Sequence, residues 1–403
     1  MMALDLTRTA IQIDDMAASL RAGRADWHAR LESARAAAFK FDPVVYSAKL
    51  GQAETDLDWV VPDVYDRLDV SYAPPPLPRD YIVVGVDGSH VDVSRHLPAH
   101  CYLINIGGMT LRYGSAPDAQ VFSTPRLYAN ADDLVIRDRD APYREETISG
   151  ALLDAKRAVE ELAGLLERLR ESPPDIPAVG LIDGSLILFG MHRHPPFVVR
   201  NLVEEGYVVL LDELRQLSLE RPLAIASYIS LPRSMEVVNA LRLAVCPYPV
   251  AACDRQCGVK RIGERPCDLE VGGVLDRLLF DDFLGLGERT AAFGSNAAIV
   301  RDRYGGHGVS FFYVKTEEEI GRVEVPDWVA EDEALLGVVH SLVVEQCRLG
   351  LGYPVALKEA HEQAVVTGAD RQYFVALIED ALEQQGLPVY SSEKNISKIR
   401  RWI

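Results

Sequence analysis

Hydrophobic and polar residues alternate with two different periods along the chain. Residues 5–40 carry apolar side chains at roughly helical spacing among charged ones, which predicts an amphipathic helix, and a second such stretch runs to about residue 70. The segment 73–80 (APPPLPRD) then brings four prolines, which exclude a continuing helix and predict a stiff spacer. We therefore expect residues 1–72 to form an N-terminal helical region.

Beyond the spacer the pattern becomes that of buried strands. Residues 81–89 (YIVVGVDGS) and 178–190 (AVGLIDGSLILFG) are near-continuous apolar runs, which suit strands covered on both faces. Residues 100–114 and 119–128 are expected to pair beside the first run as a meander. The remaining predicted elements are helices over 143–171, 202–220 and 332–350, a strand and then a helix from about Ser234 within 222–244, a hairpin over 308–326, and an extended-then-helical stretch over 353–370.

Strands first, then alternating strands and helices, predict an α/β fold in which helices flank a mixed β-sheet. We expect this domain to cover residues 80–390, with an irregular, cysteine-containing insertion over 245–300. Residues 391–403 are expected to form a basic tail, whose cations are Lys394, Lys398, Arg400 and Arg401. Such a tail could contact a DNA backbone, or simply fray.

Composition narrows the class of protein. The chain has 403 residues, 48% of them hydrophobic, and no apolar run long enough to predict a membrane span. Its first residues lack the basic-then-apolar pattern of a signal peptide, so a cytoplasmic location is expected. A net charge of −18 argues against a general nucleic-acid coat protein. It still allows an enzyme in which divalent cations offset clustered carboxylates.

Four of the six cysteines lie close together in the sequence: Cys246, Cys253, Cys257 and Cys267. Their gaps of six, three and nine residues differ from the paired C-x-x-C spacing of common zinc sites. Two interpretations stay open, namely buried thiols in an irregular loop, and a structural zinc or iron–sulfur centre.

Two aspartates stand out, because Asp87 and Asp183 each end an apolar run and each is followed by Gly-Ser. One Asp-Gly pair after a strand usually marks only a turn. If the two strands are neighbours, however, the two carboxylates emerge together, and a divalent cation such as Mg²⁺ or Mn²⁺ would relieve their repulsion. This arrangement is typical of metal-dependent phosphoryl transfer. A third acid could come from the preceding predicted helix, which offers Glu160, Glu161 and Glu167.

A series of motifs resembles the NurA nuclease family over most of residues 80–400. In order they are VDGSH, LIDGSL, SYISLPRSMEVVNALR, FFYVKTEEEIGRVEVPDWV and LGYPVALKEAHEQAVV. The resemblance implies an RNase H-like core and a Mn²⁺-dependent deoxyribonuclease, with 5′–3′ exonuclease and single-strand endonuclease activity. It also implies a homodimer that works with the ring-shaped helicase HerA in DNA end resection during double-strand break repair.

The family's active-site residues can be carried over one by one. The acid of the first strand falls on Asp87, the later aspartate on Asp183, and a tyrosine and a histidine on Tyr353 and His361. The helical glutamate is best matched by Glu161. The alternatives are Glu160 and, if an insertion lies elsewhere, Glu145 and Glu146. The resemblance thus implies metal binding by Asp87, Glu161, Asp183 and His361.

Arg233 and Ser234 lie where a predicted strand turns into a helix, so the helix N-terminus and the guanidinium could hold a DNA phosphate. Two rival functions remain. One is a catalytically inactive, nuclease-like scaffold that docks a helicase ring. The other is an ATPase or phosphatase of the actin-like fold, which is disfavoured because the chain has no G-x-x-x-x-G-K-[ST] motif.

Overall fold

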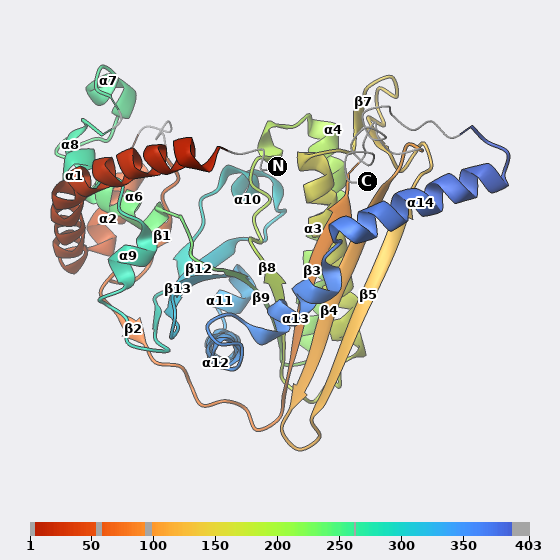
Figure 1. Ribbon diagram of the computed structural model, residues 1–403. Helices are drawn as coiled ribbons and strands as arrows, with labels where there is room; N and C mark the ends of the chain where they lie inside the picture. The colour runs from red at the N-terminus through yellow and green to blue at the C-terminus, as the bar shows by residue number, and fades with distance from the viewer. Residues whose placement is uncertain (1–4, 54–58, 93–98, 262, 389–403) are drawn as a thin grey trace.

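The computed structural model describes residues 5–53, 59–92, 99–261 and 263–388. Within them a long mixed sheet runs through the molecule, with helices on both faces (Figure 1). The predicted basic tail lies outside the described residues.

Five strands form the half of the sheet that carries Asp87 and Asp183. In spatial order they are β5 (Asp118–Tyr128), β4 (Tyr102–Tyr113), β3 (Tyr81–Val91), β8 (Ala178–Asp183) and β9 (Leu223–Ile229). The first three form an antiparallel meander, and β3, β8 and β9 run parallel to one another. This is the strand order of an RNase H-like fold, so the predicted fold class is confirmed.

The second half of the sheet continues from β9 in antiparallel fashion. Its strands are β13 (Ile320–Pro326), β12 (Val309–Lys315), β11 (Phe293–Gly294) and β1 (Asp63–Val64), with β10 (Arg289–Thr290) and β2 (Ser71–Tyr72) beside β12. The two-residue strands β1 and β2 pair with β11 and β10, so the segment before the proline spacer joins the edge of the main sheet.

One face of the sheet is covered by a buried cluster built on Ile82, Val84 and Val86 of β3. The helices on this face are α3 (Ala151–Glu171), α4 (Pro196–Val199), the π-helix η2 (Arg200–Tyr207), α5 (Val208–Glu220) and α10 (Ala298–Arg303). Because side chains alternate along a strand, Tyr81 and Val83 point to the other face. The helices on that face are α11 (Asp327–Ala330), α12 (Glu333–Leu349) and α13 (Val355–Ala364).

A third buried cluster joins the N-terminal helices to the irregular segment that follows β9. Its helices are α1 (Leu6–Phe39), α2 (Pro43–Gln52), α6 (Glu236–Ala244), α8 (Pro266–Val271) and α9 (Asp276–Phe280), and α7 (Cys253–Cys257) lies beside them. The last helix, α14 (Gly368–Gln384), buries none of its residues and projects from the opposite end of the molecule (Figure 1).

Three local predictions are wrong. The second helical stretch, expected to run to about residue 70, ends at Gln52, because residues 63–64 and 71–72 pair with strands of the main sheet. The helix expected from residue 143 begins at Ala151, because the residues before it form a small hairpin of β6 (Val135–Arg137) and β7 (Glu145–Thr147). The strand expected over 178–190 ends at Asp183. Gly184 and Gly190 both adopt positive φ, and the short 3-10 helix η1 (Met191–Arg193) follows.

Candidate active site

Asp87 and Asp183 lie side by side at the carboxyl ends of β3 and β8. The parallel register pairs Val86 with Ile182, so the next residue of each strand is an aspartate on the same face of the sheet. Asp87 is buried, whereas the Asp183 carboxylate is open to solvent. Partial desolvation raises the pKa of Asp183, and the charge of Asp87 adds to this effect, while a hydrogen bond from Tyr353 opposes it. The adjacency predicted from the two Asp-Gly-Ser stretches is therefore present.

His361 reaches this pair from α13. Its Nδ1 lies 2.8 Å from Oδ2 of Asp87, and its side chain is 57% exposed. The other oxygen of Asp87 accepts the backbone N–H of Gly88 at 2.7 Å. Because Nδ1 is engaged by Asp87, Nε2 is the ring nitrogen available to a substrate or solvent.

Two strand glycines allow α13 to lie directly on the sheet. A Cβ on Gly85 would fall 2.4 Å from the carbonyl oxygen of Ala356, and one on Gly107 would fall 2.2 Å from the backbone nitrogen of Ala364. The helix end is held by Ser89 Oγ and Asn105 Nδ2, which donate to the carbonyl of Ala364 at 2.5 and 2.9 Å. These contacts set the position of His361.

Tyr353 holds the second aspartate. Its hydroxyl hydrogen-bonds to Asp183, and its ring packs edge-on against Tyr228, with ring centroids 5.6 Å apart. Burial raises the pKa of Tyr353 strongly, and the charge of Asp183 raises it further. The phenol therefore stays protonated and acts as a hydrogen-bond donor.

Glu161 approaches from the other face of the sheet, on α3, and is buried. A Cβ on Gly88 would lie 2.6 Å from Glu161 Oε1, so this glycine makes room for the carboxyl group. Arg157 donates to Glu161 Oε1 at 2.5 Å and to the Gly88 carbonyl at 2.8 Å. Burial raises the pKa of Glu161 to about 8, with the Arg157 charge opposing and the charges of Asp87 and Asp183 reinforcing the shift.

The other candidate glutamates lie elsewhere. Glu160 bonds to the Tyr128 hydroxyl and to Arg126 of β5 at 2.8 and 2.6 Å. Glu167 is exposed on the same helix. Glu145 and Glu146 are exposed in β7 rather than in a helix. Only Glu161 of this set is buried against Gly88, so the structure favours the assignment made from the resemblance.

The helix N-terminus at which a phosphate was expected is occupied by other groups of the protein. Helix α6 begins at Glu236, and its first free N–H groups, those of Val237 and Val238, are already bound by the buried Asp276 carboxylate at 3.2 and 2.8 Å. Ser234 is itself paired with the Tyr313 hydroxyl at 2.8 Å. Arg233, in contrast, is exposed.

Arg233 and Ser234 both line a cavity of about 150 Å³. Phe189, 58% exposed, and the buried Arg322 also line this cavity. It borders the loop after β8, because Glu324 of the cavity accepts hydrogen bonds from Ser185 Oγ and the Leu186 N–H at 2.7 and 2.9 Å.

The site carries suitable donors for a hard divalent cation, namely carboxylate oxygens and one imidazole. Within the described residues, no three His, Cys, Asp or Glu side chains are already arranged as a ligand set. Glu161 is paired with Arg157, and Asp87 with His361. Glu161 would have to leave Arg157 to bind a cation.

Several residues that shape the site were missed from the sequence. Arg157 lies four residues before Glu161, the spacing of a helical ion pair, and could have been found on that ground. The Gly-Gly pair at 107–108, inside an apolar strand, is a pattern that indicates close backbone approach. No sequence pattern indicates that Asn105 contributes to the site.

Comparison with known proteins identifies the family of the chain. The family model of the NurA domain matches residues 81–366. Among solved structures, the chain is similar to a NurA crystallised with manganese, at 13% identity over 76% of this chain and 90% of that one, with a TM-score of 0.34. It is also similar to LC9-RNase H1, a type 1 RNase H with the type 2 active-site motif, at 13% identity over 42% and 72% of the two chains, with a TM-score of 0.23. No curated protein matches the sequence.

Proposed function

The chain belongs to the NurA family of nucleases, and from this premise we propose that it hydrolyses DNA phosphodiester bonds with the help of a divalent cation, Mn²⁺ or Mg²⁺. The observation that supports the proposal is that Asp87 and Asp183 end two neighbouring parallel strands, while Glu161 of α3 packs against Gly88, the residue after Asp87. Neighbouring carboxylates repel one another unless a cation joins them.

Asp87, Asp183 and Glu161 would hold the cation, with His361 as a further ligand or a proton-transfer group. When bound, a divalent cation polarises a phosphoryl oxygen and lowers the pKa of a nearby water. The contribution of the protein's other residues is to position these carboxylates. His361 orients Asp87 through Nδ1, and Tyr353 orients Asp183 through its hydroxyl.

His361 is suited to a second task. Its imidazole is more than half exposed, and Nε2 is not engaged by Asp87. Nε2 is therefore placed to donate a proton to the leaving oxygen or to accept one from a water.

The strand being cut is proposed to run past the cavity that Arg233 and Phe189 line. An exposed guanidinium can grip a phosphate and an exposed phenyl ring can stack on a base, and both groups are open to solvent here. Ser234 lines the same cavity and is proposed to contribute to DNA binding there, with its hydroxyl also hydrogen-bonded to Tyr313.

The finer functions are proposals that rest on the family. They are 5′–3′ exonuclease and single-strand endonuclease activity, action beside a HerA-type ring helicase in DNA end resection and repair, a homodimer, and a cytoplasmic location. Exposed apolar side chains along the first half of α1, such as Ile11, Met16 and Leu20, support a protein partner there. No helix in the described residues is both long and apolar enough to cross a membrane.

The proposal is tested with end-labelled single-stranded and duplex DNA, with Mn²⁺, with Mg²⁺ and with a chelator. Wild-type protein should cut only with the metals, and Asp87→Asn and Asp183→Asn should abolish cutting. Asp175→Asn is the matched control, because Asp175 is exposed just before the opposite end of β8. Wild-type protein that leaves every substrate intact, alone and with its helicase, would instead favour the inactive scaffold.

A further inference from the structure

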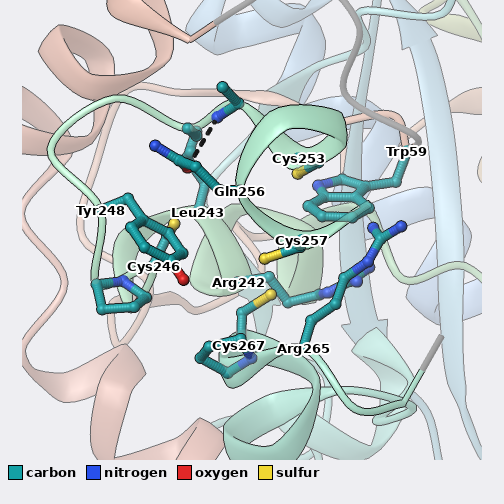
Figure 2. Close-up of a pocket in the computed structure, with 14 residues that line it drawn as sticks. Trp59, Arg242, Leu243, Cys246, Tyr248, Cys253, Gln256, Cys257, Arg265 and Cys267 are labelled. Carbon is teal, nitrogen blue, oxygen red and sulfur yellow. Dashed lines mark hydrogen bonds between the residues drawn. The ribbon is translucent and has the colours of Figure 1, made fainter. Parts of the chain in front are cut away.

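Four of the six cysteines surround one cavity, far from the acidic site. Cys246 follows the end of α6, Cys253 and Cys257 lie one turn apart on α7, and Cys267 lies in α8. All four line a cavity of about 20 Å³ (Figure 2). Residues four apart on a helix share a face, so α7 alone directs two thiols to this point. The irregular spacing of these cysteines in the sequence does not reveal that they line one cavity.

The surroundings of the cavity suit an anionic centre. Arg242 and Arg265 run along one side of it, with Trp59 (Figure 2). The guanidinium of Arg242 lies 3.6 Å from the Trp59 ring centroid and is also paired with Asp268. A metal bound by four thiolates carries net negative charge, which two neighbouring guanidinium groups would offset.

The size of the cavity suits a single ion, because 20 Å³ holds about one water-sized sphere. A thiophilic ion bound there would have four cysteine side chains around it as ligands.

We propose that Cys246, Cys253, Cys257 and Cys267 form a tetrathiolate metal centre. The cavity has room for a single ion such as Zn²⁺, and an iron–sulfur cluster shares the same ligand chemistry. In the described part of the chain the sulfurs are not yet arranged as one ligand set, so binding would draw α7 and α8 together around the cavity.

The centre is structural rather than catalytic. It lies on the side of the molecule that holds the N-terminal helices, away from β3, β8 and α13 (Figure 1). Arg30 of α1 donates to the carbonyl of Gly272, directly after α8, at 2.9 Å. A metal would therefore fix the segment between α6 and α9, which has only short helices of its own, against α1 and α6.

The test is the metal content of the full-length protein, purified without added metal and without chelator. We expect about one zinc per chain, or iron with matching acid-labile sulfide and visible absorbance, which separates the two metals. Cys253→Ser and Cys257→Ser should each lower that content several-fold. The controls Cys101→Ser and Cys347→Ser, which change buried cysteines elsewhere, should leave it unchanged.

A second measurement, on wild-type protein, keeps the proposal testable if the cysteine variants fail to fold. Titration of folded wild-type protein with an organomercurial should release the metal as about four thiols react. The proposal is overturned if wild-type protein carries no zinc or iron and takes up no added Zn²⁺, or if the metal survives loss of these thiols. Asp87→Asn should keep this metal, so failure here is distinguishable from failure of the nuclease proposal.

Discussion

His361 and Asp87 are 274 positions apart in the chain, yet His361 Nδ1 lies 2.8 Å from Asp87 Oδ2. The contact exists because α13 rests on the backbone of β3 and β4 at two glycines. It places His361 of α13 beside Asp87 of β3. The histidine thereby joins the carboxylates that β3, β8 and α3 supply.

His361→Gln should reduce cleavage by about 10²–10⁴-fold, since it removes a proton-transfer group and the partner of Asp87. The measurement is kcat and KM for a labelled oligonucleotide with saturating Mn²⁺. Glu362→Gln is the control, because Glu362 is the exposed next residue of α13. Equal activity of the two variants would show that His361 is a bystander.

Tyr353→Phe should have a smaller effect, about 10–100-fold, because it removes only the hydrogen bond that orients Asp183. The ring contact with Tyr228 is kept, so the thermal unfolding midpoint should change little. A loss of Mn²⁺ affinity that matches the loss of activity would identify Tyr353 as a positioning residue. Unchanged affinity and activity would exclude that role.

Glu161 should make the stability of the metal-free protein depend on pH. Its pKa is about 8 in the folded chain against an ordinary 4.5, so the unfolded state releases this proton first as pH rises. Folding stability should therefore fall between about pH 4.5 and pH 8. Glu161→Gln should flatten this part of the profile, as measured by thermal unfolding in chelator.

A cation reverses this effect by favouring the ionised form of Glu161. The stabilisation by Mn²⁺ should accordingly be larger at pH 8.5 than at pH 6 in wild-type protein. In Glu161→Gln the two values should be similar. A pH-independent stabilisation of wild-type protein would mean that Glu161 does not bind the metal.

Gly107→Ala should displace α13, since the new Cβ would lie 2.2 Å from the backbone of Ala364. We expect about 1–3 kcal/mol of destabilisation, as for an overpacked core, together with lost cleavage. Gly23→Ala, at an open position in α1, is the matched control and should be neutral or slightly stabilising. If Gly107→Ala is as stable and active as wild type, α13 is not held as described.

Local patterns were enough to predict the centre of the fold and its acids. The apolar runs that end in Asp-Gly-Ser placed Asp87 and Asp183 at strand ends, and neighbouring parallel strands put such ends together. Tyr353 and His361 were predictable only from the family motif, since a tyrosine and a histidine eight positions apart have no chemistry of their own.

The errors arose where distant contacts decide local structure. Strands β1 and β2 are too short to show a period and exist because β11 and β10 pair with them. The N-terminus of α6 looked open to phosphate, but Asp276 caps it from some forty residues further along the chain. The apolar residues after Asp183 are buried without forming a strand, because Ser185 and Leu186 bind Glu324 instead.

Asp87, Asp183 and Glu161 are proposed to bind one divalent cation together. The most direct test is a crystal structure of the protein soaked in Mn²⁺, with anomalous diffraction recorded at the manganese absorption edge. The account predicts anomalous density bounded by these three carboxylates, with the Arg157–Glu161 pair opened. Density elsewhere, or none at a Mn²⁺ concentration that supports cleavage, would contradict it.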